Sequence, residues 1–148
     1  MTINSGFTRL LAALSLLLGA TSAFAATRTV TIDAPAEAVA GSKVSVTFSA
    51  ATDVGGNEQI GFLYAAYSVD GGLTWTGTCF DQSVGPKATR NMVIPVGAKG
   101  SQAKVRVMAA FRGGKAGDVD YSGAPIKWDG SWSKWETPPA RYVTIAVK

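Results

Sequence analysis

Residues 60–80 have the sequence IGFLYAAYSVDGGLTWTGTCF, in which two extended runs flank a turn. Its first half, 60–69, is apolar or aromatic on both faces of an extended chain, which is typical of a central strand covered on both sides. Asp70, Gly71 and Gly72 supply a tight turn, and residues 74–80 form a second extended run. The stretch therefore predicts a β-hairpin whose first strand lies inside a sheet.

The same two-residue period governs most of the chain outside this hairpin. The one Ala-rich stretch, residues 34–40, ends at Gly41 before a full helix can form. The pattern predicts an all-β fold, an antiparallel β-sandwich of about seven strands, as one domain over residues 26–148. Besides the hairpin, we expect strands at 29–32, 43–49, 92–96, 105–112 and 143–147.

One connection is too long for a plain sandwich. Residues 113–139 separate the sixth and last strands, whereas most connections have about 4–6 residues. Within them, Asp129-Gly130 lies between IKW and SWS, a signal for a two-residue hairpin. The sequence therefore predicts a long loop or hairpin insertion before the last strand.

The N-terminal residues 1–25 have the pattern of a secretory signal peptide. A short segment with one basic residue precedes an apolar run at 10–20, and Ala23 and Ala25 supply the small residues of a cleavage site. A run of this length is shorter than the roughly 20 residues that span a bilayer. We therefore expect cleavage near Ala25, no membrane span, and an extracytoplasmic protein, periplasmic or secreted.

Composition excludes several classes of function. The chain has 148 residues, a net charge of +4 and no histidine, which removes the commonest general base and metal ligand. Its basic residues are scattered, whereas nucleic-acid binders concentrate them on one face. We therefore expect no enzyme activity, no cofactor, no metal and no nucleic-acid partner.

The turn of the hairpin carries a recognisable motif. Residues 68–75, SVDGGLTW, fit the pattern S-x-D-x-G-x-T-W at every defined position. This resembles the Asp-box, a hairpin motif that recurs on sialidase propellers and also occurs singly in other extracellular β-domains. The resemblance implies a structural hairpin in which Asp70 accepts hydrogen bonds from turn amides and the tryptophan folds back, and it implies no catalysis. Its residues are Ser68, Asp70, Gly72, Thr74 and Trp75.

The strand rhythm of the remaining chain is similar to that of immunoglobulin-like or fibronectin type III domains of bacterial secreted proteins. That similarity lacks the Cys…Trp…Cys spacing of antibody-type domains, because Cys79 is the only cysteine. A single cysteine in a secreted chain either forms an intermolecular disulfide, giving a dimer, or stays buried as a small hydrophobic residue. The neighbouring Phe80 favours burial.

Three tryptophans lie within eight residues of the long insertion: Trp128, Trp132 and Trp135. They form either an aromatic platform for a glycan or peptide, with Lys127 beside Trp132, or a small additional core over the edge of the sandwich. Two carboxylates, Asp118 and Asp120, with Asp129, resemble calcium ligands only superficially, since no bidentate Glu follows.

These observations leave three functional hypotheses open. The first is a secreted, non-catalytic interaction or structural module that binds another secreted or surface protein. The second is a carbohydrate-binding module that uses the tryptophan-containing insertion. The third is an accessory subunit of an extracytoplasmic enzyme. Fold class alone does not decide among them.

Overall fold

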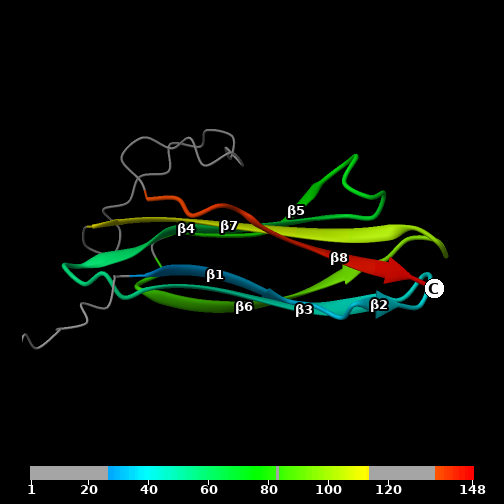
Figure 1. The fold of residues 1–148 in the computed structure, drawn as a ribbon, viewed down its shortest axis with the longest axis horizontal. Coiled ribbons are helices and arrows are strands. Elements are labelled where there is room, and N and C mark those ends of the chain that lie inside the picture. Colours follow the sequence, from blue (N-terminus) through cyan, green and yellow to red (C-terminus); the bar gives the residue numbers. More distant parts are fainter. Residues whose placement is uncertain (1–26, 83, 114–135) are drawn as a thin grey trace, which may run out of the picture.

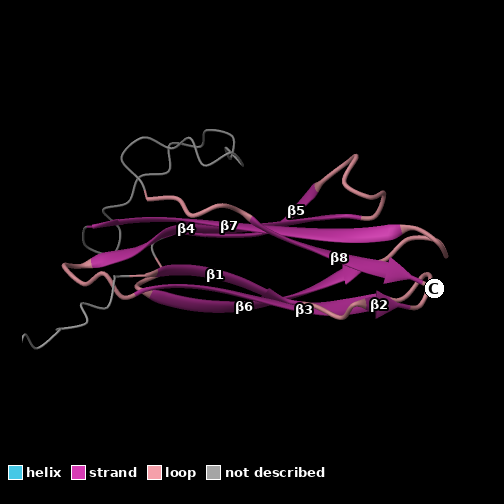
Figure 2. Cartoon of the chain, viewed as in Figure 1, coloured by secondary structure: helices cyan, strands magenta, loops and turns pink. Residues whose placement is uncertain are grey.

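A computed structural model describes residues 27–82, 84–113 and 136–148. All regular elements in these residues are strands, so the predicted all-β class is confirmed (Figure 2). The chain forms two sheets that lie face to face as two layers (Figure 1). The strands are β1 (Arg28–Asp33), β2 (Glu37–Ala38), β3 (Lys43–Thr52), β4 (Glu58–Ser68), β5 (Thr76–Gln82), β6 (Lys87–Pro95), β7 (Gln102–Gly113) and β8 (Arg141–Val147).

The smaller sheet has three strands in the order β1-β3-β6, and the larger has five in the order β2-β8-β7-β4-β5. Pairing is antiparallel except between β2 and β8, which run parallel. The expectation of a wholly antiparallel arrangement is therefore corrected to one antiparallel and one mixed sheet. The described residues also contain eight strands where the sequence predicts about seven.

Strand β2, which the sequence did not predict, arises because the chain passes from the smaller to the larger sheet after β1. Pro35 lies in this crossing, and the next residues pair with the C-terminal strand. The amide of Ala146 donates to the carbonyl of Ala36 and that of Lys148 to the carbonyl of Ala38, both at 2.9 Å. The Ala-rich segment, residues 34–40, therefore contains a short strand and no helix. Its carbonyl groups accept hydrogen bonds from the C-terminal residues 146 and 148.

The main core lies between the two sheets. Alternation along β3 directs Val46 and Phe48 inward, where neither has measurable exposure. Leu63 and Phe111 meet them from the larger sheet, also fully buried. Burying such aliphatic and aromatic side chains stabilises the fold by about 1.5–3 kcal/mol each. One apolar core therefore holds both sheets together.

Strand β4 is covered on both faces, as the sequence predicts. Its pairing with β7 slips by one residue between Ile60 and Phe62, a bulge that inserts Gly61. Because of this bulge, Ile60 packs in the main core while Phe62 packs with Met108 in a second small cluster. The large sheet therefore carries apolar side chains on its outer face as well.

Candidate functional site: the hairpin between β4 and β5

The turn after β4 is organised around one carboxylate. Asp70 accepts hydrogen bonds from the Ser68 hydroxyl at 2.6 Å, the Thr74 amide at 2.9 Å and the Thr74 hydroxyl at 2.5 Å. These donors, Ser68 first, hold the pKa of Asp70 far below its usual range. The carboxylate is therefore committed to the turn and is a poor proton donor or acceptor at neutral pH.

The buried Ser68 hydroxyl completes the turn from the strand side. It accepts a hydrogen bond from the Gly72 amide at 2.9 Å while it donates to Asp70. Gly71 and Gly72 have φ values of 75° and 97°, a left-handed conformation that side-chain-bearing residues rarely adopt. The Gly71 amide also donates to the Gln102 carbonyl at 3.0 Å, which ties the turn to the start of β7.

Trp75 folds back over this turn. Its indole Nε1 donates to the Gly72 carbonyl at 3.0 Å. The guanidinium carbon of Arg106, on β7, lies 4.1 Å from the centroid of the indole ring, a close cation–π contact. Tyr142, on β8, meets the indole edge-on, with centroids 6.4 Å apart and an interplanar angle of 75°. We call these three residues the Trp75–Arg106–Tyr142 cluster.

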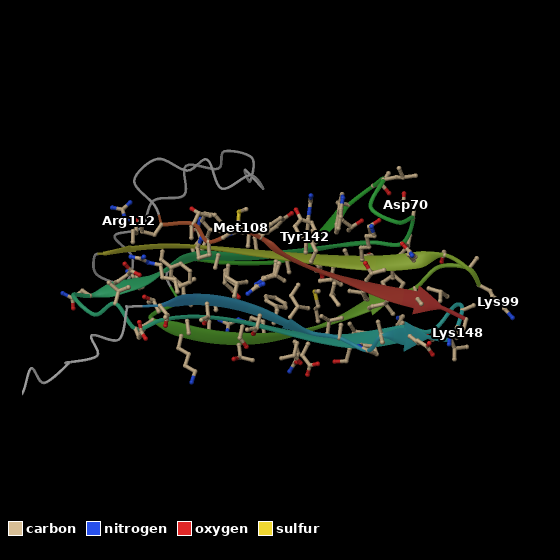
Figure 3. All side chains as sticks on the ribbon, in the orientation of Figure 1. Asp70, Lys99, Met108, Arg112, Tyr142 and Lys148 are labelled. Atoms are coloured by element: carbon tan, nitrogen blue, oxygen red, sulfur yellow. The ribbon has the colours of Figure 1, made fainter. Side chains whose placement is uncertain are left out.

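The cluster lies on the outer face of the large sheet. Register places Ala66, Arg106 and Tyr142 side by side on β4, β7 and β8. Figure 3 shows Asp70, Met108 and Tyr142 on this same side of the sheet. Burial lowers the pKa of Arg106, and the neighbouring Tyr142 offsets this only in part. The guanidinium nevertheless stays charged, because its ordinary pKa is far above neutral pH.

Exposure differs along this outer face. Tyr142 is 58% exposed and Leu73, in the turn, is 85% exposed. By contrast, Phe62 and Met108 are fully buried, with Tyr64 and Ala140 packed against them. Tyr142 is therefore presented to solvent beside Trp75 of the hairpin.

The structure does not describe the other side chains singled out from the sequence. Trp128, Trp132, Trp135 and Lys127 lie outside the described residues, as do Asp118, Asp120 and Asp129. The backbone of Cys79 lies in β5, opposite Ala65 of β4. The platform, calcium and disulfide hypotheses therefore stay predictions.

Sequence reasoning missed Arg106 and Tyr142. One signal points to Arg106: it lies between Val105 and Val107, at a position whose parity places it on the outer face with Met108. No local pattern links it to Trp75 or Tyr142, because sheet pairing alone brings the three together.

Within the described ranges, no three His, Cys, Asp or Glu side chains are grouped closely enough to hold a metal ion. The described residues also contain no helix long and apolar enough to cross a membrane.

Comparison with known proteins gives a likeness of fold. No family model matches this chain, and no curated protein matches it in sequence. Among solved structures, the chain is similar to a superoxide reductase (neelaredoxin) from Ignicoccus hospitalis, with 11% identity and a TM-score of 0.50. The similarity covers 84% of each chain. At this identity the likeness shows the fold alone.

This finding corrects the expectation that the chain is not an enzyme. That expectation rested on the absence of histidine, whereas a fold similar to this one is carried by a reductase. The inference failed because architecture does not determine whether a domain is catalytic. The reductase activity belongs to the similar protein and is not transferred to this chain.

Proposed function

We propose that this chain is an extracytoplasmic interaction module of immunoglobulin-like or fibronectin type III-like sandwich architecture. In this proposal it binds another secreted or surface protein through the Trp75–Arg106–Tyr142 cluster. The observation that carries it is the position of Tyr142, which is 58% exposed although its ring packs edge-on against Trp75. Tyrosine, tryptophan and arginine are enriched among the residues that anchor protein interfaces.

The fixed orientation of the ring supports this proposal. Trp75 is fixed by its bond to Gly72, and Arg106 stacks on the indole. Tyr142 contacts a rigid neighbour, so its ring is already held in place before a partner binds. Binding would therefore cost little side-chain entropy at Tyr142. Leu73 and Val69 add exposed apolar surface on the same hairpin. The glycan-binding and enzyme-accessory hypotheses rest on residues outside the described ranges or on no specific contact, so they remain predictions.

A photo-crosslinking experiment tests the proposal. A benzophenone-bearing phenylalanine at position 142 is exposed to cell-envelope and culture-medium proteins of the source organism. The matched control places it at position 93, because Val93 is 62% exposed but lies on β6 of the other sheet. We expect one dominant crosslinked protein at position 142 and none at 93.

Competition shows whether the capture is specific. Unlabelled wild-type protein in excess should abolish the crosslink, whereas the Tyr142→Ala variant should not compete. Equal crosslinking at both positions, or equal competition by the variant, would refute the proposal.

A further inference from the structure

Strand β1 has one free edge. In the part of the chain that the structure describes, it pairs with β3 only and lies at the end of the three-stranded sheet. Backbone groups of an antiparallel strand point alternately to its two sides. The Thr27 carbonyl accepts from Asp53 on the β3 side, so the peptide groups of Arg28, Val30 and Ile32 point the other way. An edge of this kind is a template for another strand.

A groove follows this free edge. A hollow of about 300 Å³ lies between Val30–Ile32 of β1 and Arg141–Val143 of β8. A second, of about 350 Å³, continues past Arg28 and is bounded by Pro138 and Pro139. The six residues of β1 span about 20 Å, the length of a typical strand. The groove is therefore long enough for one extended segment of chain.

Arg141 lies against the free edge of β1 and indicates the chemistry of a ligand that could bind there. Its Nε donates to the Val30 carbonyl at 3.2 Å, so a side chain satisfies a backbone acceptor that a neighbouring strand would otherwise use. This is the one polar contact of the guanidinium among the described residues, and Arg141 is exposed. No carboxylate within the described ranges forms an ion pair with it.

We propose that the groove between β1 and β8 binds an extended segment of another polypeptide, which adds to β1 as a fourth strand and carries a carboxylate that pairs with Arg141. The incoming amide takes the Val30 carbonyl, and the displaced guanidinium then needs an acceptor beside the new strand. A carboxylate meets that need with two parallel hydrogen bonds. Main-chain pairing supplies the affinity, and the charge supplies the selectivity.

This groove adjoins the surface proposed for Tyr142, because Tyr142 borders both. The groove recognises backbone and one charge, whereas the cluster offers aromatic surface. The two proposals are therefore told apart by their tests, the groove through β1 and Arg141 and the cluster through Tyr142.

The test uses a synthetic peptide of about eight residues, the length of a strand, with alternating valine and threonine and one central glutamate. Binding is measured by fluorescence anisotropy and located by amide chemical shifts. We expect the largest shifts in β1 and at Arg141. N-methylation of alternate peptide amides should weaken binding at least about tenfold, because it removes the ladder hydrogen bonds.

The role of the Arg141 charge is tested by comparing the binding of a charged peptide with that of its uncharged analogue. Wild-type protein should prefer the glutamate peptide over its glutamine analogue by about fivefold, and Arg141→Gln should abolish this preference. The control is Arg90→Gln, on β6 at the other end of the three-stranded sheet, where Arg90 pairs with Asp81. This variant should keep the preference.

Four results would overturn the proposal: no binding at millimolar peptide, equal binding of the N-methylated peptide, shifts confined to β5 or β6, or a preference that survives Arg141→Gln. A dimer in sedimentation with β1 amides protected in the absence of peptide would also overturn it, since the occupant would then be a second copy of this chain.

Discussion

Replacing Trp75 with alanine tests whether the hairpin between β4 and β5 is a rigid support for Tyr142. The change removes the hydrogen bond to Gly72, the stacking of Arg106 and the edge contact with Tyr142. The ring is only partly buried, so we expect a loss of about 3 kcal/mol in the free energy of unfolding, the lower end for a large aromatic residue. Trp75→Phe keeps most of the packing and should lose about 1 kcal/mol through the missing donor.

Urea unfolding followed by far-ultraviolet circular dichroism measures these differences, since each variant's transition is fitted with its own folded and unfolded baselines. The matched control is Leu73→Ala in the same hairpin, where the side chain is 85% exposed and the change should stay within about 0.5 kcal/mol. A Trp75→Ala variant as stable as this control would refute the reasoning, because Tyr142 would then have no rigid neighbour.

Three further predictions concern pH, packing and processing. Hydrogen bonds lower the pKa values of two carboxyl groups, from Ser68 to Asp70 and from Arg28 to Glu58. Carboxyl groups whose pKa is lowered in the folded state stabilise the fold above about pH 4, and this stability is lost as the pH falls further. Thermal melts should show this loss, and it should be shallower in Asp70→Asn. Gly77→Ala should cost about 1–2 kcal/mol in urea unfolding, because a Cβ there would lie 2.2 Å from the hydroxyl oxygen of Tyr64; an unchanged midpoint would contradict this packing. Intact-mass analysis of the exported protein should show a chain that begins directly after Ala25, and a mass that includes the apolar run would disprove the signal peptide.

The fold could be predicted where side-chain alternation decides it. Strand β3 alternates between buried and partly exposed residues, and β4 is apolar on both faces, so both strands follow from sequence. Strand β2 could not be predicted, because it has two residues and its partners, Ala146 and Val147, are over a hundred residues away. The change of sheet after β1 depends on that distant pairing and has no local signal.

The candidate site also has a part that the sequence predicts and a part that depends on distant pairing. The hydrogen bonds of the hairpin join residues two to four positions apart, so the eight-residue motif was sufficient to place Asp70 and Trp75. Arg106 and Tyr142 come from other strands and meet Trp75 only through sheet register. The similarity to a reductase could not be predicted either, because no sequence pattern indicated that a β-fold of this kind is carried by an enzyme.

The proposed function depends on Tyr142 as the anchor of an interface. The most direct measurement is the dissociation constant of the crosslinked partner for wild-type protein, Tyr142→Ala and Val93→Ala, by isothermal titration calorimetry. Truncating an interface anchor costs about 2 kcal/mol or more, so Tyr142→Ala should weaken binding at least about thirtyfold. Val93→Ala, equally exposed but on the other sheet, should change it by less than about twofold. Equal dissociation constants for all three proteins would contradict the account.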